Sequence, residues 1–186
     1  MAQEERIRRV AWRRRDTVGT EWCELNVRPE KTRLGGTVVM AWEGEPWRIS
    51  YAIDLDAEGR TRAVAVEADG AAPVSVALVA DGAGRWLRDG HVVIDSPDAL
   101  DVDLGFSPST NTLPIRRLGV AVGESAEIAV AWVLFPSFEV EYGGQIYTRL
   151  GERRWRYQST GFDAELTVDE DGLVESYSEW ESVARS

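Results

Sequence analysis

The sequence predicts a mainly all-β fold with antiparallel strands and at most short helices. Three observations lead to this prediction. Apolar and polar residues alternate in short runs, clusters of Gly, Asp and Pro separate these runs, and helical periodicity is scarce. Strict alternation is typical of strands with one buried face, and the separating clusters are typical of turns.

The clearest strand spans residues 47–55, where Trp47 and every second residue after it are apolar. The turn sequence DAEG follows this strand, and alternation then resumes over residues 61–68. Further runs of the same kind cover residues 74–81, 127–135 and 164–170. Residues 107–118 break the pattern with proline and hydroxyl-bearing side chains, so we expect a turn or a short helix there.

The length of 186 residues fits a single domain, residues 1–186. Residues 53–66 and 166–179 each contain a strand, a tight acidic turn with glycine and a second strand. Each of these hairpins follows a strand that contains Trp and Tyr. We therefore expect two related halves, at about residues 1–95 and 96–186, within the one domain.

The chain is acidic, with 32 Asp and Glu against 21 Lys and Arg and a formal net charge of −11. This charge argues against nucleic-acid binding and against docking on an anionic membrane surface. Six arginines nevertheless lie between Arg6 and Arg15. Ile7, Val10 and Trp12 punctuate this run, so we interpret it as a solvated first strand whose charges pair with acidic residues elsewhere.

Cysteine and histidine each occur once, as Cys23 and His91. An intramolecular disulfide and a zinc site built from these residue types are therefore excluded, and we expect no metal and no cofactor. We expect Cys23 to be a small buried residue and His91 a surface residue on a strand. The chain shows no apolar leader, and its longest apolar run, residues 128–135, is too short to cross a bilayer. We therefore expect a soluble, cytoplasmic protein that is not integral to a membrane.

The acidic pair Asp101 and Asp103 is the first feature that could carry chemistry. Residues two apart on a strand point to the same face, about 6.5–7 Å apart. That separation is in the range of inverting glycosidases, but their carboxylates normally come from different elements on either side of the sugar. Alternation on a half-exposed strand explains the same spacing, so we favour a structural interpretation over catalysis.

The sequence SPSTNT and the pair Arg116 and Arg117 follow these aspartates. One interpretation is a polar structural corner in which Asp, Asn and Arg fix a chain reversal. The other is the polar rim of a binding site for a headgroup, because arginine and asparagine suit sugar hydroxyls and phosphate. Since a buried arginine requires a carboxylate partner, we predict that Asp101 or Asp103 holds at least one of the two arginines.

The block DVDLGFSPSTNTLPIRRL, residues 101–118, resembles the signature of the bacterial family of putative glycolipid-binding proteins. Further segments resemble family segments in the family order, at residues 19–26, 49–64, 131–136, 145–150 and 164–180. The resemblance thus covers essentially the whole chain. It implies an antiparallel sheet rolled into an incomplete or spiral barrel, similar to lipoprotein-carrier folds that hold acyl chains against a concave apolar face. It implies no catalytic residues.

We therefore expect a non-enzymatic binding protein for a lipid-like or glycolipid-like amphiphile. The candidate ligand-binding residues are Asp101, Asp103, Asn111, Arg116, Arg117, Arg62, Arg149 and Trp155. Arg62 and Arg149 each follow a threonine on strands in opposite halves. They either converge on the ligand or are simply solvated strand residues, and the second interpretation is the simpler one for each arginine alone.

Two other functions fit the sequence. A hydrolase or isomerase acting on a sugar or lipid would use Asp101, Asp103 and Glu165 as acid and base, and would need a carboxylate with a perturbed pKa inside a cleft. A structural or oligomerising module without a small ligand would have fully packed Trp and Tyr side chains and no cavity. Between enzyme and binding protein, we lean toward a protein that is not an enzyme.

Overall fold

The computed structural model describes residues 5–186, and within them one sheet of 15 strands carries the fold. The first eight strands are β1 (Arg6–Arg14), β2 (Gly19–Val27), β3 (Thr32–Trp42), β4 (Glu45–Leu55), β5 (Thr61–Asp69), β6 (Val74–Ala80), β7 (Arg85–Arg88) and β8 (His91–Asp95). The others are β9 (Ala99–Leu104), β10 (Ser125–Val133), β11 (Val140–Arg149), β12 (Arg154–Ser159), β13 (Phe162–Val168), β14 (Val174–Tyr177) and β15 (Trp180–Arg185). The predicted all-β class is confirmed.

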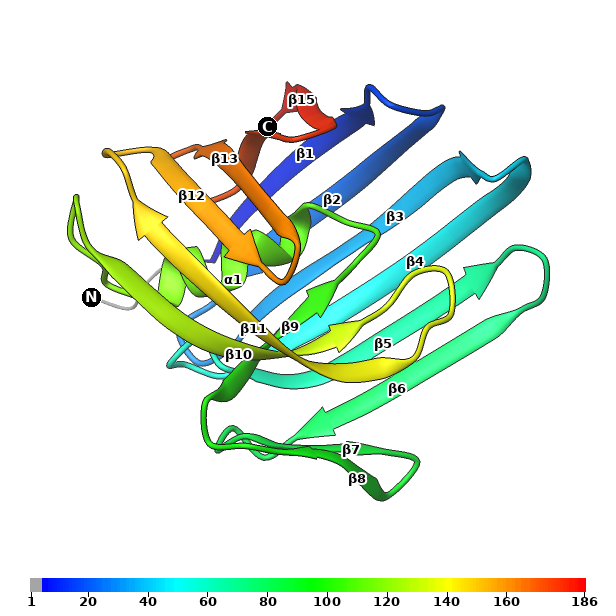
Figure 1. The fold of residues 1–186 in the computed structure, drawn as a ribbon, viewed down its shortest axis with the longest axis horizontal. Helices are drawn as coiled ribbons and strands as arrows, with labels where there is room; N and C mark the ends of the chain where they lie inside the picture. Colours follow the sequence, from blue (N-terminus) through cyan, green and yellow to red (C-terminus); the bar gives the residue numbers. More distant parts are fainter. Residues whose placement is uncertain (1–4) are drawn as a thin grey trace.

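Strands β1–β8 form one antiparallel meander and β10–β15 form a second, and β1 pairs with β15 to join them. The parallel pair β9–β10 is the exception to the antiparallel pattern. Strands β8 and β9 are the two edges of the sheet, but β9 lies near β5 and β11 lies near β8. The sheet therefore rolls into a nearly closed barrel with one unsealed seam, as the resemblance implied (Figure 1).

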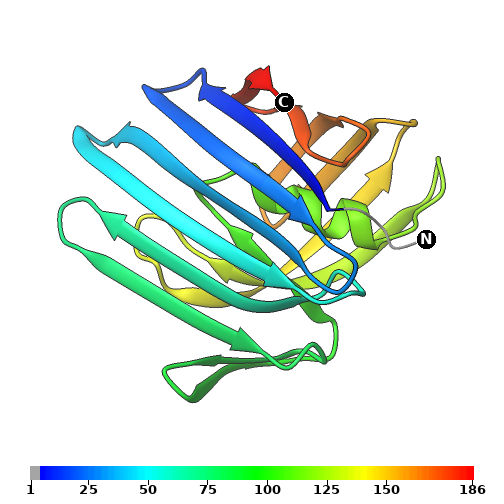
Figure 2. The same cartoon turned by 180° about the vertical axis from the view of Figure 1, so that it is seen from behind.

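The interior of the roll is occupied by residues 106–117, which we call the plug. It contains a 3-10 helix (Ser109–Asn111) and the short helix α1 (Thr112–Arg117). Figures 1 and 2 show α1 between the β1–β4 side and the β10–β13 side of the roll, seen from either direction. Every residue from Phe106 to Pro114 is buried. The predicted short helix at 107–118 is confirmed, and its position inside the barrel is new.

The predicted alternation explains the core. On β4 the five inward positions from Trp47 to Leu55 are all buried. The aromatic rings of Trp47, Phe106, Phe135 and Phe138 pack edge-on or tilted against one another at centroid distances of 5.2–6.2 Å. The plug is thus bound to the sheet by large apolar side chains as well as by hydrogen bonds.

The acidic glycine turns share one hydrogen-bonding pattern. Asp56 Oδ1 accepts from the backbone N–H groups two and four residues later, and Asp169 Oδ1 does the same. A third copy occurs at Asp81, inside the first meander. Because this turn closes three hairpins, it recurs throughout the sheet and does not by itself indicate two related halves. The division into two related halves stays a prediction.

The arginine-rich start forms β1 and pairs with acidic residues, as predicted. Arg8 Nε lies 2.7 Å from Asp171, and Arg9 Nε lies 2.9 Å from Glu24. Cys23 is fully buried and His91 is exposed at the start of the edge strand β8, which confirms both predictions. Within residues 5–186, no helix combines the length and apolar character that crossing a membrane requires.

Candidate functional site

Asp103 is the carboxylate around which the best-formed site is built. Gln145 Nε2 on β11 donates to its Oδ2 at 2.6 Å, and Thr110 Oγ1 in the plug donates to its Oδ1 at 3.3 Å. The Tyr157 hydroxyl on β12 donates to Oδ2 at 3.5 Å. Burial raises the pKa of Asp103 to about 6, and these hydrogen bonds offset part of the effect.

Tyr147 continues this network into the plug. Its hydroxyl donates to Asn111 Oδ1 at 2.9 Å, while its ring packs edge-on against Tyr157 at a centroid distance of 5.3 Å. Burial raises the pKa of both tyrosines, so both hydroxyls stay protonated and act as donors at neutral pH. The polar groups around Asp103 are therefore fixed by three elements, β11, β12 and the plug.

A cavity of about 360 Å³ opens onto Asp103 at one mouth of the roll, and we call it the aromatic pocket. Its ring-bearing lining residues are Trp132, Tyr157, Phe162, Tyr177 and Trp180, and its polar side chains include Arg14, Asp103, Ser107, Asn111 and Glu179. The rings of Tyr157, Phe162 and Tyr177 contact one another at centroid distances of 5.9–6.0 Å and form one wall. The pocket thus combines apolar rings with a few polar groups, which is typical of small-ligand sites.

The carboxyl group of Glu21 on β2 is fully buried between the first meander and the plug. Its Oε1 accepts from the Tyr51 hydroxyl at 2.5 Å and from Ser107 Oγ at 2.7 Å, while its Oε2 is buried with no hydrogen-bond partner. Burial raises the pKa of Glu21 to about 8, against the lowering effect of these two hydrogen bonds. Glu21 is therefore mostly protonated and uncharged at neutral pH, and in this state it accepts the hydrogen bond that holds Ser107 in place.

Gly36 makes the Tyr51–Glu21 contact sterically possible. Gly36 on β3 lies opposite both Cys23 on β2 and Tyr51 on β4. A Cβ at this position would lie 2.6 Å from the Tyr51 hydroxyl oxygen. Because glycine has no side chain, the Tyr51 ring crosses β3 and reaches Glu21 two strands away.

Arg117 and Asp101 form the predicted ion pair. Arg117 Nη2 lies 2.5 Å from Asp101 Oδ2, and Arg117 Nε donates to Asp101 Oδ1 at 3.3 Å. Asp101 is fully buried and the Arg117 side chain is 15% exposed. Arg116 instead donates from Nη1 to the Asp171 carbonyl at 2.6 Å. The interpretation of residues 101–118 as a polar structural corner is therefore correct for Asp101 and Arg117.

The interpretation of residues 101–104 as a half-exposed strand was wrong. Val102 and Leu104 are buried on one face of β9, and Asp101 is fully buried on the other. The physical reason is that the rolled sheet covers β9 on both faces. One part of its surroundings is β5, and the face that carries Asp103 contacts the plug and Gln145 of β11. Asp101 is fully buried and Asp103 is half-buried, so both aspartates require partners, and Arg117 and Gln145 supply them.

The structure brings together only part of the predicted ligand-binding set. Asp103 and Asn111 line the aromatic pocket, whereas Arg116 and Arg117 line a cavity of about 200 Å³ near Val27 and Leu55. The antiparallel β1–β2 register puts Val27 and Arg14 at opposite ends of that hairpin, so the two cavities lie at opposite mouths.

Arg62, Arg149 and Trp155 lie outside the aromatic pocket. Arg149 is stacked over Trp155 at 5.6 Å and donates to the carbonyl of Val120, and both residues line a surface hollow that Arg116 also lines. Arg62 donates to the Ala80 carbonyl on β6. The suggested convergence of Arg62 and Arg149 is therefore wrong in this structure, because Arg62 binds β6 while Arg149 binds the loop carbonyls of Val120 and Glu152.

The site also contains residues that the sequence did not single out, chiefly Glu21, Gln145 and Tyr147. The signal for them is a polar residue at an inward position of an alternating strand. Gln145 and Tyr147 share such a face on β11, and both are buried. On β2 the signal is ambiguous, because Trp22 lies on the outward face and Glu21 on the inward one.

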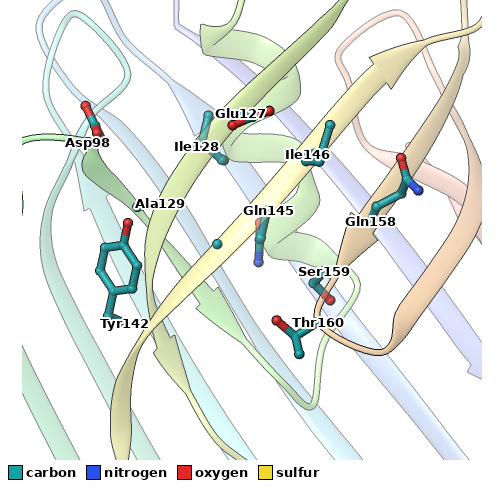
Figure 3. Close-up of a pocket in the computed structure, with 11 residues that line it drawn as sticks. Asp98, Glu127, Ile128, Ala129, Tyr142, Gln145, Ile146, Gln158, Ser159 and Thr160 are labelled. Carbon is teal, nitrogen blue, oxygen red and sulfur yellow. The ribbon is translucent and has the colours of Figure 1, made fainter.

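A larger cavity of about 530 Å³ lies on the opposite face of β10–β12. Its residues Ile146 and Gln158 alternate with Gln145 and Tyr157, and so point away from Asp103. Figure 3 shows Asp98 and Tyr142 on one side of β11, with Gln158, Ser159 and Thr160 on the other. Gln145 also lines this cavity, and Ser159 and Thr160 line both cavities. The carboxylates of the larger cavity, Asp98 and Glu127, are exposed, so we favour the smaller aromatic pocket as the candidate site.

Comparisons with known proteins agree with this fold. A family model described as "Putative glycolipid-binding" matches residues 9–182. Among solved structures, the chain is similar to a DUF1089 family protein from Pseudomonas aeruginosa, at 33% identity and a TM-score of 0.75, over 84% of this chain and 88% of that one. Comparison with curated proteins gave no match. The family match over nearly the whole length, on a rolled sheet like that of a solved relative, shows that this chain belongs to the putative glycolipid-binding family.

Proposed function

We propose that this protein binds the polar, sugar-like headgroup of an amphiphile in the aromatic pocket, without changing it chemically. The observation that carries the proposal is the combination of aromatic rings and a half-buried carboxylate in one cavity. Aromatic faces pack against the C–H faces of a sugar ring, and a carboxylate accepts hydrogen bonds from its hydroxyl groups. The family description supports a ligand of this class.

The plug determines where the apolar tail of such a ligand goes. Phe106 and Leu113 fill the interior with side chains that are 1% exposed, so we propose that the tail does not enter the roll. Trp132 and Phe162, at 37% and 38% exposed, offer apolar surface at the pocket. The headgroup would thus bind against Asp103 while the first carbons of the tail contact these two rings.

The paired-carboxylate hydrolase is less well supported. Asp101 is neutralised by Arg117, and Glu165 is an exposed residue paired with Arg154 on the neighbouring strand. Asp103 alone combines a raised pKa with a position in a cleft. Asp101 and Glu165 do not line the aromatic pocket, so the predicted acid–base pair is not assembled around Asp103.

Isothermal titration with octyl β-D-glucoside below its micelle concentration tests the proposal. 1-Octanol is the matched ligand that keeps the chain and lacks the sugar. We expect saturable 1:1 binding of the glucoside and no saturable binding of the alcohol. Equal binding of both ligands, or binding of neither, would contradict a headgroup site. Native mass spectrometry of protein purified from its own host should show a co-purifying amphiphile, which lipid extraction would then identify.

A further inference from the structure

The negative charge of Asp103 has no cationic partner in its pocket. Within residues 5–186, the side chains that hydrogen-bond its carboxylate are Gln145, Thr110 and Tyr157, all of them neutral donors. The neighbouring Asp101, two residues earlier on β9, is by contrast bound by Arg117. When the half-buried Asp103 carboxylate is ionised, these neutral donors leave its negative charge uncompensated.

The one arginine that lines the aromatic pocket is already bound elsewhere. Arg14 donates from Nε to Asp16 Oδ1 at 2.9 Å and from Nη2 to Asp16 Oδ2 at 2.5 Å. Its guanidinium carbon also lies 5.2 Å from the ring centroid of Trp180. Glu179, half-buried in the same lining, adds a second negative charge. Because Arg14 is paired with Asp16, the carboxylates of Asp103 and Glu179 give the aromatic pocket a net negative charge.

Aromatic faces beside an uncompensated carboxylate are the features that bind ammonium groups. The ring faces attract a cation through their quadrupole, and the carboxylate supplies a charge-assisted contact. A neutral sugar hydroxyl would satisfy the hydrogen bond but leave the charge of Asp103 uncompensated. We propose that the headgroup bound in the aromatic pocket carries a positively charged nitrogen, as an amino sugar or an alkylammonium group does, and that this nitrogen lies against Asp103.

This inference rests on the headgroup site proposed above and names the charge of its ligand. It also predicts a pH dependence, because protonation of Asp103 below about pH 6 removes the attraction. Three tyrosines face Asp103: Tyr147 on β11, Tyr157 on β12 and Tyr177 on β14. The charged groups around it are Asp101 on β9 with its partner Arg117, and Arg14 and Glu179 in the pocket lining. The three tyrosines stay protonated because burial raises their pKa, so Asp103 is the group in this set whose raised pKa falls near 6.

The test uses two ligands that differ by one group, octyl β-D-glucoside and its 2-amino-2-deoxy counterpart, titrated at pH 7. We expect the amino form to bind about tenfold more tightly, which corresponds to one charge-assisted contact. The Asp103→Asn variant should bring this ratio close to one, and Glu179→Gln, at the rim, should reduce it less. Equal affinities for the two ligands in the native protein would overturn the ammonium inference and leave the headgroup site standing. Binding of neither sugar would contradict a sugar headgroup in this pocket.

Octyltrimethylammonium allows a test on the native protein, so no variant has to fold. Its positive charge is independent of pH, and any change in affinity with pH therefore comes from the protein. We expect its affinity for the native protein to fall severalfold between pH 7 and pH 5, while that of the neutral glucoside stays constant. Tight binding of octyltrimethylammonium without binding of either sugar would support the ammonium inference and contradict a sugar headgroup. An octyltrimethylammonium affinity that does not change with pH would overturn the assignment of the nitrogen to Asp103.

Discussion

Ser107 in the plug donates a hydrogen bond of 2.7 Å to Glu21 on β2, across 86 residues of sequence. The same Glu21 oxygen accepts from Tyr51 on β4. The plug is thus bound to the first meander through one buried carboxyl, to β9 through Thr110 and Asp103, and to the second meander through Asn111 and Tyr147. The plug contacts both meanders, and the aromatic pocket depends on its position.

The first prediction concerns pH and Glu21. Its folded pKa of about 8 lies above the ordinary value of 4.5, so between these values the folded protein holds a proton that the unfolded chain releases. The free energy of unfolding therefore falls as pH rises through this window, by up to about 1.4 kcal/mol per pH unit from this group. Glu21→Gln removes the titration. Urea unfolding at pH 5 and pH 8 should show the variant gaining stability relative to the native protein as pH rises; an unchanged difference between the two would contradict the buried, protonated state.

The second prediction concerns the buried ion pair. Arg117→Met leaves Asp101 fully buried without its cation, and we expect a loss of about 3–5 kcal/mol in the free energy of unfolding. The double variant Asp101→Asn with Arg117→Met should recover part of this loss, because it removes the uncompensated charge. Urea denaturation of both variants measures the difference. A loss below about 1 kcal/mol for Arg117→Met would contradict this prediction, because a loss of that size is typical of solvent-exposed ion pairs.

The third prediction concerns the glycine beneath Tyr51. In Gly36→Ala the new Cβ would lie 2.6 Å from both the Tyr51 hydroxyl oxygen and the Trp22 carbonyl oxygen. The Tyr51 ring must therefore move away from Glu21, and the backbone between β2 and β3 must also shift. We expect a loss of about 1–3 kcal/mol in the free energy of unfolding. Gly144→Ala on β11 is the matched control, because a Cβ there meets no atom within 4 Å. Equal thermal stability of the two variants would show that the Tyr51–Glu21 contact does not require Gly36.

Much of the fold could be predicted from the sequence, because strand alternation is a local property. The five inward residues of β4 were identified correctly, and so was the short helix after Phe106. The place of that helix inside the roll could not be predicted, since it depends on β9 pairing in parallel with β10 and lying near β5. Local composition at residues 101–118 indicates a polar corner but carries no information about which strands surround it.

Distance along the chain also decided which contacts of the site could be predicted. The Asp101–Arg117 pair was predictable, because its members lie 16 residues apart and a buried arginine requires a carboxylate. The partners of Asp103 on β11 and β12 are 42 and 54 residues away, and only the register of the rolled sheet brings them together. The grouping of Arg62 and Arg149 with Asp103 failed for the same reason, whereas Arg116 is close to Asp103 in sequence but binds the Asp171 carbonyl instead.

The fourth prediction tests the headgroup site most directly. Trp132 lines the aromatic pocket at 37% exposure, and Trp22 is a 49% exposed tryptophan of β2 outside that pocket. We predict that Trp132→Ala weakens binding of octyl β-D-glucoside by about tenfold or more, as loss of an aromatic contact does. Trp22→Ala should bind like the native protein, and circular dichroism should show both variants folded. Isothermal titration of the two folded variants is the decisive measurement: an unchanged affinity in Trp132→Ala, or an equal loss in Trp22→Ala, would contradict binding in the aromatic pocket.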